Sequence, residues 1–220
     1  MLKLKRGDKV NICYIACALD AKLDFMPDEN DLVIGADRGC QVLLNQEKRI
    51  DLAVGDFDSG EVPTNVSVIK YPVKKDKTDG AIAIKHAIEK GYDKIRMYGA
   101  IGGLLDHTIA IISTMCFYAE KCIDIALIDG ENVIFAIHNK KICFSKEASG
   151  RISVFSHTDK SYGVTEKGLL YTLDNYTLDN ETSLGSGNSF IGNESEISVK
   201  EGTLLIYTSK NNFDNHLTNC

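Results

Sequence analysis

The stretch LAVGDFDS, residues 52 to 59, places an apolar run directly before two aspartates that are one residue apart. The run is typical of a short buried strand, and GDFDS begins where that strand is expected to end. In an extended segment residues i and i+2 point to the same side, so Asp56 and Asp58 would bring two negative charges together. Their repulsion favours a bound cation. Alternatively, the pentapeptide is a polar turn in which each aspartate caps a local backbone N–H.

The first part of the chain alternates short β-rich runs with helical patterns. The β-rich runs cover residues 10–16, 31–35, 52–54, 66–70, 95–98 and 123–128. Helices are expected over residues 79–90, closed by Gly91 as a C-cap, and over residues 106–121. This alternation predicts an α/β domain over residues 1–138 with a mostly parallel sheet.

After about residue 139 the helical period disappears. Five β-rich segments follow, separated by Gly, Asn and Asp: KICFS, RISVFSH, GLLYTL, SEISVK and TLLIYTS. They predict an all-β domain over residues 139–220. Residues 131–138 are either a last strand of the first domain or the connection to the second.

Composition and charge exclude several classes of function. With 44% hydrophobic and 25% charged residues, the chain has the composition of an ordinary globular protein. A net charge of −6 argues against a broad surface for nucleic acid or anionic membranes. The N-terminal segment has no secretory core, which predicts a cytoplasmic location. The seven cysteines contain no C-x-x-C pair and are expected to be reduced.

Acids and glycines follow several of the expected strands. VIGAD ends at Asp37, LAVGD ends at Asp56, and RMYGAIGG supplies Gly99, Gly102 and Gly103. Ligands of open α/β sheets bind at the carboxyl ends of the strands, so these residues are expected to converge on one crevice. The glycines would let the backbone approach a bulky anion closely.

A mixture of acids and lysines precedes the helix expected to begin near Asp79. In KKDKTDGA, residues 74–81, either Thr78 or Asp79 can serve as the N-cap. Carboxylates beside lysines at a helix N-terminus also suit a magnesium polyphosphate. Asp106 and His107 open the next expected helix. Alone, they would be an N-cap and a structural histidine, but after the glycines they indicate a nucleotide loop.

The motifs G-A-D-R-G, G-D-F-D-S, D-K-T-D and G-G-x-x-D-H, in this order, resemble the thiamin pyrophosphokinase family. The resemblance continues through GVTEKGLLYTLDNYTL and SLGSGNSF in the second half. It implies an α/β domain followed by a β-sandwich, and transfer of the diphosphoryl group of Mg-ATP to the hydroxyl of thiamin, which gives thiamin diphosphate and AMP. It also implies a homodimer whose active sites lie between the α/β domain of one subunit and the β domain of the other.

The resemblance also assigns roles to residues by position. The metal-binding acids are Asp56, Asp58 and Asp79, and the catalytic crevice contains Asp37, Asp56, Asp79 and Asp106. The nucleotide-binding residues are Lys77, Thr78, Gly99, Gly102, Gly103 and His107. Ser186 and Asn188 lie at or next to the thiamin-contacting element. The chain departs from the family pattern at Leu104, where the family has an arginine, and at Gly187, where the family has a serine before the asparagine.

Two other functions remain open from the sequence. One is a metal-dependent glycosyl or nucleotidyl transferase, for which the D-x-D of GDFDS alone would suffice. The other is a thiamin- or nucleotide-binding protein without catalytic activity, which the loss of the arginine at Leu104 makes conceivable.

Overall fold

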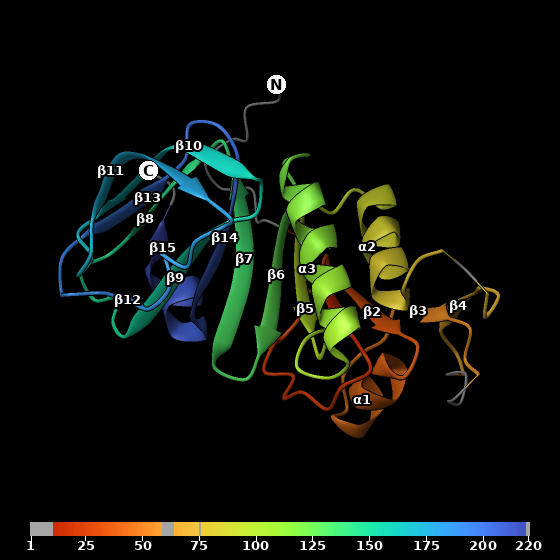
Figure 1. The fold of residues 1–220 in the computed structure, drawn as a ribbon. Coiled ribbons are helices and arrows are strands. Elements are labelled where there is room, and N and C mark those ends of the chain that lie inside the picture. Colours follow the sequence, from red (N-terminus) through yellow and green to blue (C-terminus); the bar gives the residue numbers. More distant parts are fainter. Residues whose placement is uncertain (1–10, 59–63, 75, 219–220) are drawn as a thin grey trace. The chain divides into compact units, whose positions relative to one another are not determined.

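The computed structural model describes residues 11–58, 64–74 and 76–218. The chain forms two compact units that divide between Tyr98 and Gly99, and Figure 1 labels the elements of each. In the described residues no helix is long and apolar enough to cross a membrane.

The first unit is a parallel sheet with two helices. Its elements are β1 (Cys13–Ala16), β2 (Leu32–Ala36), α1 (Gly39–Asn45), β3 (Leu52–Gly55), β4 (Ser67–Lys70), α2 (Asp79–Glu89) and β5 (Lys94–Tyr98). The strand order is β5-β1-β2-β3-β4, and every neighbouring pair is parallel. The predicted parallel α/β arrangement is confirmed.

Helices cover both faces of this sheet. Every residue of β2 and β3 is buried, as expected for central parallel strands. The crossover through α1 runs from β2 to β3, whereas the crossover through α2 returns from β4 to β5 in the opposite direction. Right-handed crossovers of opposite direction place their helices on opposite faces. Because all these strands are parallel, their carboxyl ends lie at one edge of the sheet.

The second unit contains one long helix and two antiparallel sheets. Its elements are α3 (Leu105–Ala119), β6 (Asp124–Asp129), β7 (Asn132–His138), β8 (Lys141–Phe144), β9 (Arg151–Ser156), β10 (Lys160–Lys167), β11 (Leu173–Asp179), β12 (Asn188–Ser189), β13 (Ser195–Ser198), β14 (Thr203–Ser209), the π-helix η1 (Asn212–His216) and β15 (Leu217–Thr218). Within this unit the strand orders are β12-β9-β14-β7-β6 and β11-β10-β13-β8-β15.

The two sheets of the second unit pack as a sandwich. Buried and less buried residues alternate along β7, β8 and β13, the pattern of strands with one face toward a core. Phe144, on β8, contacts Phe190, beside β12, with ring centroids 5.1 Å apart. The predicted all-β sandwich is confirmed. Helix α3 packs against β6 and β7 (Figure 1), and β7 pairs with β14 along its whole length, so residues 132–138 are a strand of this unit.

The cysteines are mostly but not entirely as expected. Cys13, Cys17, Cys40, Cys116 and Cys122 are free thiols. Cys143 is disulfide-bonded, so the prediction that all seven cysteines are reduced is wrong for this residue.

An acid lies in the interior of the sandwich. Glu166, on β10, is 1% exposed. Its Oε2 accepts a hydrogen bond from Nδ2 of Asn188 at 2.9 Å, and its Oε1 has no hydrogen-bond partner among the described residues. Burial raises the pKa of Glu166 to about 7, and the hydrogen bond from Asn188 offsets only part of this rise.

The raised pKa predicts how stability depends on pH. The folded state favours the protonated carboxyl, so the contribution of Glu166 to stability is complete below its ordinary pKa of 4.5 and is lost as the pH rises through about 7. Replacing Glu166 by Gln removes this titration. Between pH 5 and pH 8, the free energy of unfolding of the wild type should fall by roughly 2 to 3 kcal/mol relative to Glu166→Gln.

Denaturant unfolding at several pH values measures this difference. Glu196→Gln, on the neighbouring strand β13, removes an acid that is ion-paired with Lys141 and controls for net charge. Parallel stability curves for the wild type and Glu166→Gln would contradict the prediction.

Candidate functional site

A tight turn after β3 brings two aspartates of GDFDS together. The strand ends at Gly55, and Phe57 has a left-handed φ of 53°, which is uncommon for a residue other than glycine. The Phe57 ring is buried and belongs to a core cluster with Cys40 and Ala53. Oδ1 of Asp56 accepts a hydrogen bond from the backbone N–H of Asp58 at 3.3 Å. The aspartates therefore converge through a turn, and the extended geometry assumed from the sequence is wrong here.

A third acid joins them from the neighbouring strand. Asp37 follows β2 with a φ of 50°, and its backbone N–H donates to the carbonyl of Val54 at 2.7 Å. A Cβ on Gly55 would lie only 3.0 Å from Cα of Asp37, so the glycine permits this close approach. Carboxylate oxygens of Asp37, Asp56 and Asp58 all lie within 4.8 Å of one another.

The electrostatics of this cluster fit a divalent cation. Burial raises the pKa of Asp37, and the charges of Asp79, Asp56 and Asp58 raise it further, against a lowering hydrogen bond from the backbone of Arg38. Oδ1 of Asp37 is buried and has no hydrogen-bond partner among the described residues. Several carboxylate oxygens facing one another are the donor set that a hard ion such as Mg²⁺ takes. The residues therefore fit the expected ion, and Asp37 lies beside Asp56 and Asp58, two of the acids that the resemblance assigns to metal binding.

Asp79 lies near the same edge, in the first turn of α2. Its charge helps to raise the pKa of Asp37. Burial raises the pKa of Cys17, the residue after β1, to about 12, and the charge of Asp79 contributes to this rise. The acids after β2 and β3, together with Asp79 at the start of α2, therefore share one region of negative potential in the first unit.

Thr78 caps α2. Its Oγ1 accepts a hydrogen bond from the backbone N–H of Ala81 at 3.3 Å, which settles the choice between Thr78 and Asp79 as the N-cap. Lys74 and Lys77 are exposed before this helix. Lys75 and Ser59, which the motifs also include, lie outside the described residues.

The glycine-rich loop and the residues after it belong to the second unit. Gly99 and Gly102 have φ values of 65° and 94°, so both use the left-handed conformations that glycine permits. Asp106 accepts a hydrogen bond from the backbone N–H of His107 at 2.9 Å, and both side chains are exposed in the first turn of α3. Leu104, at the position where the resemblance implies an arginine, precedes this helix and is 67% exposed.

Asn188 is engaged by the protein itself. Its Nδ2 donates to Glu166 and to the carbonyl of Tyr171, at 2.9 and 2.7 Å. Its Oδ1 accepts from the backbone N–H groups of Tyr171 and Ser189, at 3.0 and 2.9 Å. The side-chain amide is therefore fully hydrogen-bonded and buried. Ser186, by contrast, is exposed in the turn before β12.

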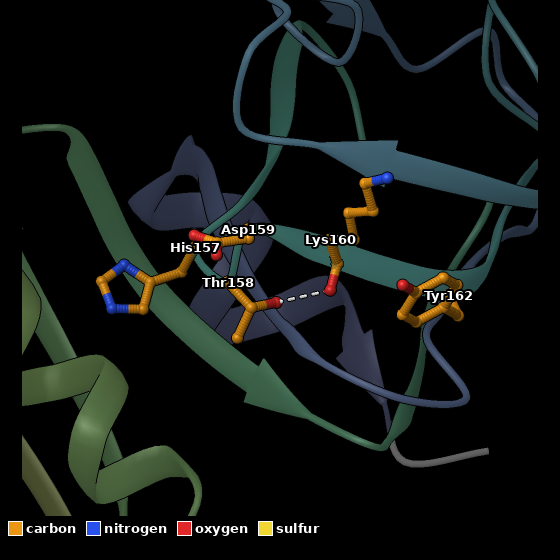
Figure 2. Close-up of a pocket in the computed structure, with 5 residues that line it drawn as sticks. All are labelled: His157, Thr158, Asp159, Lys160 and Tyr162. Atoms are coloured by element: carbon orange, nitrogen blue, oxygen red, sulfur yellow. Dashed lines mark hydrogen bonds between the residues drawn. The ribbon is translucent and has the colours of Figure 1, made fainter.

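A surface hollow of about 730 Å³ lies at the turn between β9 and β10. Figure 2 shows its lining, His157, Thr158, Asp159, Lys160 and Tyr162. The hydroxyl of Thr158 donates to the carbonyl of Lys160 at 3.0 Å and closes the turn (Figure 2). The lining includes none of the residues that the sequence motifs single out, so we assign it no function.

The predicted site residues fall into two sets. The structure brings Asp37, Asp56, Asp58 and Asp79 to one edge of the first unit, with Thr78 and Lys77 at the adjacent helix start. The loop glycines, Asp106, His107, Ser186 and Asn188 belong to the second unit. Sequence reasoning missed Phe57 and Gly55, whose turn and close packing shape the cluster, and it missed Glu166.

Comparison with known proteins covers both units. The family model described as thiamin pyrophosphokinase, catalytic domain, matches residues 25–127, and that of the vitamin B1 binding domain matches residues 139–204. A thiamine pyrophosphokinase of Bacillus subtilis is 30% identical over 190 residues, which cover 83% of this chain and 89% of that protein.

Solved structures show the same fold. The crystal structure of thiamine pyrophosphokinase from Bacillus subtilis has a TM-score of 0.78 at 26% identity and covers 90% of this chain and 99% of its own. That of thiamin pyrophosphokinase from Geobacillus thermodenitrificans has a TM-score of 0.74 at 27% identity and covers 90% and 97%. With both family models matched and these relatives aligned over most of their length, the chain belongs to the thiamin pyrophosphokinase family.

Proposed function

We propose that this protein transfers the diphosphoryl group of ATP to the hydroxyl of thiamin and releases AMP. Membership of the family supports the reaction. The observation that carries the proposal is the cluster of Asp37, Asp56 and Asp58, whose carboxylates lie within 4.8 Å of one another at the end of a parallel sheet. Such crowding of acids is unfavourable without a cation, and a nucleoside triphosphate is bound together with Mg²⁺.

The reaction requires positioning more than covalent catalysis. The hydroxyl oxygen of thiamin forms a bond to the β-phosphorus of ATP, and the bond between that phosphorus and the bridging oxygen of the α-phosphate breaks. AMP leaves with that oxygen, and the hydroxyl proton is lost to a base or to water. The transition state concentrates charge on phosphate oxygens, so the chain must hold the polyphosphate and its charge in place.

The acids of the first unit would hold the ion. Asp37, Asp56, Asp58 and Asp79 provide oxygen ligands suited to Mg²⁺, which when bound neutralises phosphate charge. Lys77 and the N-terminus of α2, capped by Thr78, supply positive potential for phosphate oxygens. Asp106, His107 and the loop glycines Gly99, Gly102 and Gly103 are proposed to contact the nucleotide.

The second half of the chain would bind the vitamin. The match of residues 139–204 to a vitamin B1 binding domain supports this role and supports a functional division near residues 138 and 139. Ser186 is exposed and is proposed to contact thiamin directly, whereas Asn188 is proposed to shape the segment around it. We also propose a homodimer in which each site uses the acids of one subunit and the β domain of the other. The cytoplasmic location remains a prediction.

One experiment tests the reaction. Purified protein is incubated with ATP, Mg²⁺ and thiamin, and the products are separated and quantified. Equal amounts of AMP and thiamin diphosphate support the proposal. Transfer of a sugar or nucleotidyl group would favour the D-x-D transferase, and thiamin or nucleotide binding with no AMP would favour a binding protein.

Asp58→Asn tests the role of the acid cluster. Loss of one carboxylate should reduce turnover at least about 100-fold at a fixed Mg²⁺ concentration, because the ion and the phosphates are then misplaced. The thermal unfolding temperature should not fall, since Asp58 is exposed. Asp93→Asn, an exposed acid at the opposite edge of the sheet before β5, is the control and should be fully active. Near-normal turnover of Asp58→Asn would remove this residue from the metal site.

Leu104→Arg tests the departure from the family pattern. A guanidinium at this position should lower the KM for ATP several-fold or raise kcat, because it can bind phosphate oxygens through two hydrogen bonds. Leu105→Arg adds the same charge at the next residue, which is 73% exposed, and should have a smaller effect. Equal effects of the two substitutions, or none, would mean that position 104 has no special access to phosphate.

Mixed subunits test the shared site. Asp58→Asn subunits are expected to have almost no activity alone, and Asn188→Ala subunits to have little activity at low thiamin concentration; refolding them together should restore part of the activity. In the mixed dimer one of the two sites would carry neither substitution. Absence of recovery in a dimer shown to contain both subunits would place each site within a single chain.

A further inference from the structure

A buried hydrogen-bond network joins three segments of the second unit. The carboxylate of Glu166 accepts from Asn188, and Asn188 in turn binds both the N–H and the carbonyl of Tyr171. The backbone N–H of Leu170 donates to the carbonyl of Ser189 at 2.9 Å. The network therefore fastens the turn after β10, residues 168–171, to β12.

Stability alone does not account for an acid at this place. Glu166 is 1% exposed, lies between β11 and β13 in its sheet, and has one carboxyl oxygen without a hydrogen-bond partner among the described residues. A buried polar atom without a partner is destabilising, and an apolar side chain of similar size would avoid this cost. The presence of the acid is therefore best explained by its hydrogen bond to Asn188.

The network fixes the main chain of two residues, Leu170 and Tyr171, whose side chains face solvent. Tyr171 is 65% exposed and Leu170 is 55% exposed, although the main chain of both is fixed by hydrogen bonds. Ser186, two residues before Asn188, is exposed as well. The fixed backbone of residues 170 and 171 therefore presents an aromatic ring and an apolar group, and the hydroxyl of Ser186 lies two residues from Asn188; this set suits recognition of a flat aromatic vitamin.

We propose that Glu166 is a positioning residue for thiamin: through Asn188 it fixes the turn at residues 168–171 against the segment that carries Ser186. This inference rests on the proposed function, since it concerns the acceptor side of that reaction. Glu166 need not touch the vitamin. Its role is to hold Asn188 in the orientation that fixes the backbone of Tyr171.

Steady-state kinetics with separate titrations of thiamin and ATP test the inference. Glu166→Leu removes the acceptor but fills the space, and should raise the KM for thiamin about tenfold while the KM for ATP and kcat change less than about twofold. Glu166→Gln keeps an oxygen for Asn188 and should restore the wild-type KM. Thr165→Val, on the same strand, removes a different hydrogen bond, the one accepted from the N–H of Asn175, and is the matched control.

Two further measurements separate positioning from general damage. Hydrogen exchange of the Tyr171 amide should become at least about tenfold faster in Glu166→Leu and stay slow in Glu166→Gln. If the leucine variant does not fold, Glu166→Asp, which retracts the carboxyl by one methylene group, should show the same rise in the KM for thiamin.

The outcomes distinguish the inference from the proposed function. An active wild type whose leucine and aspartate variants keep the wild-type KM for thiamin, or lose affinity for thiamin and ATP alike, overturns the positioning role alone. A wild type that forms no thiamin diphosphate overturns the proposed function, and the positioning role with it.

Discussion

Repulsion between carboxylates at the ends of β2 and β3 is the constraint around which the first unit is arranged. Two residues adopt left-handed backbone conformations there, Asp37 and Phe57, and Gly55 is needed for the strand ends to approach each other. Strain and like-charge contacts both destabilise the ligand-free fold, each by on the order of 1 to 3 kcal/mol. The buried Phe57 ring and the parallel sheet offset these costs, so a stable scaffold holds an unfavourable cluster in a geometry suited to a cation.

Much of the fold follows from sequence patterns, and the failures have physical causes. Runs of β-branched and apolar residues predicted the strands of the parallel sheet to within a few residues. Helix α1, with seven residues, makes only two turns and is too short to show a helical period. The convergence of Asp56 and Asp58 was predicted from an extended backbone, but the chain turns at Phe57. The motif therefore predicted that these two side chains converge, but for a geometric reason that does not hold.

The β-rich half was harder to interpret. Glu166 stands between Thr165 and Lys167 in a polar run, and nothing in that run indicates burial. Its partner Asn188 is 22 residues further on, so the pair becomes visible only when β10 and β12 are placed in space. Asn188 was predicted at or next to the thiamin-contacting element, and its four hydrogen bonds to protein groups indicate how it can serve that element without contacting the ligand. Strand β7 pairs with β14, about 70 residues later, a long-range contact that periodicity does not encode.

Thermal unfolding with and without Mg²⁺ tests most directly whether the acids are crowded in order to hold a cation. Without a divalent ion, Asp58→Asn should be more stable than the wild type, because one of the repelling charges is gone. Addition of Mg²⁺ should raise the unfolding temperature of the wild type more than that of the variant, since only the wild type has the full ligand set. A wild type that does not respond to Mg²⁺, together with a variant that is less stable in its absence, would contradict the account.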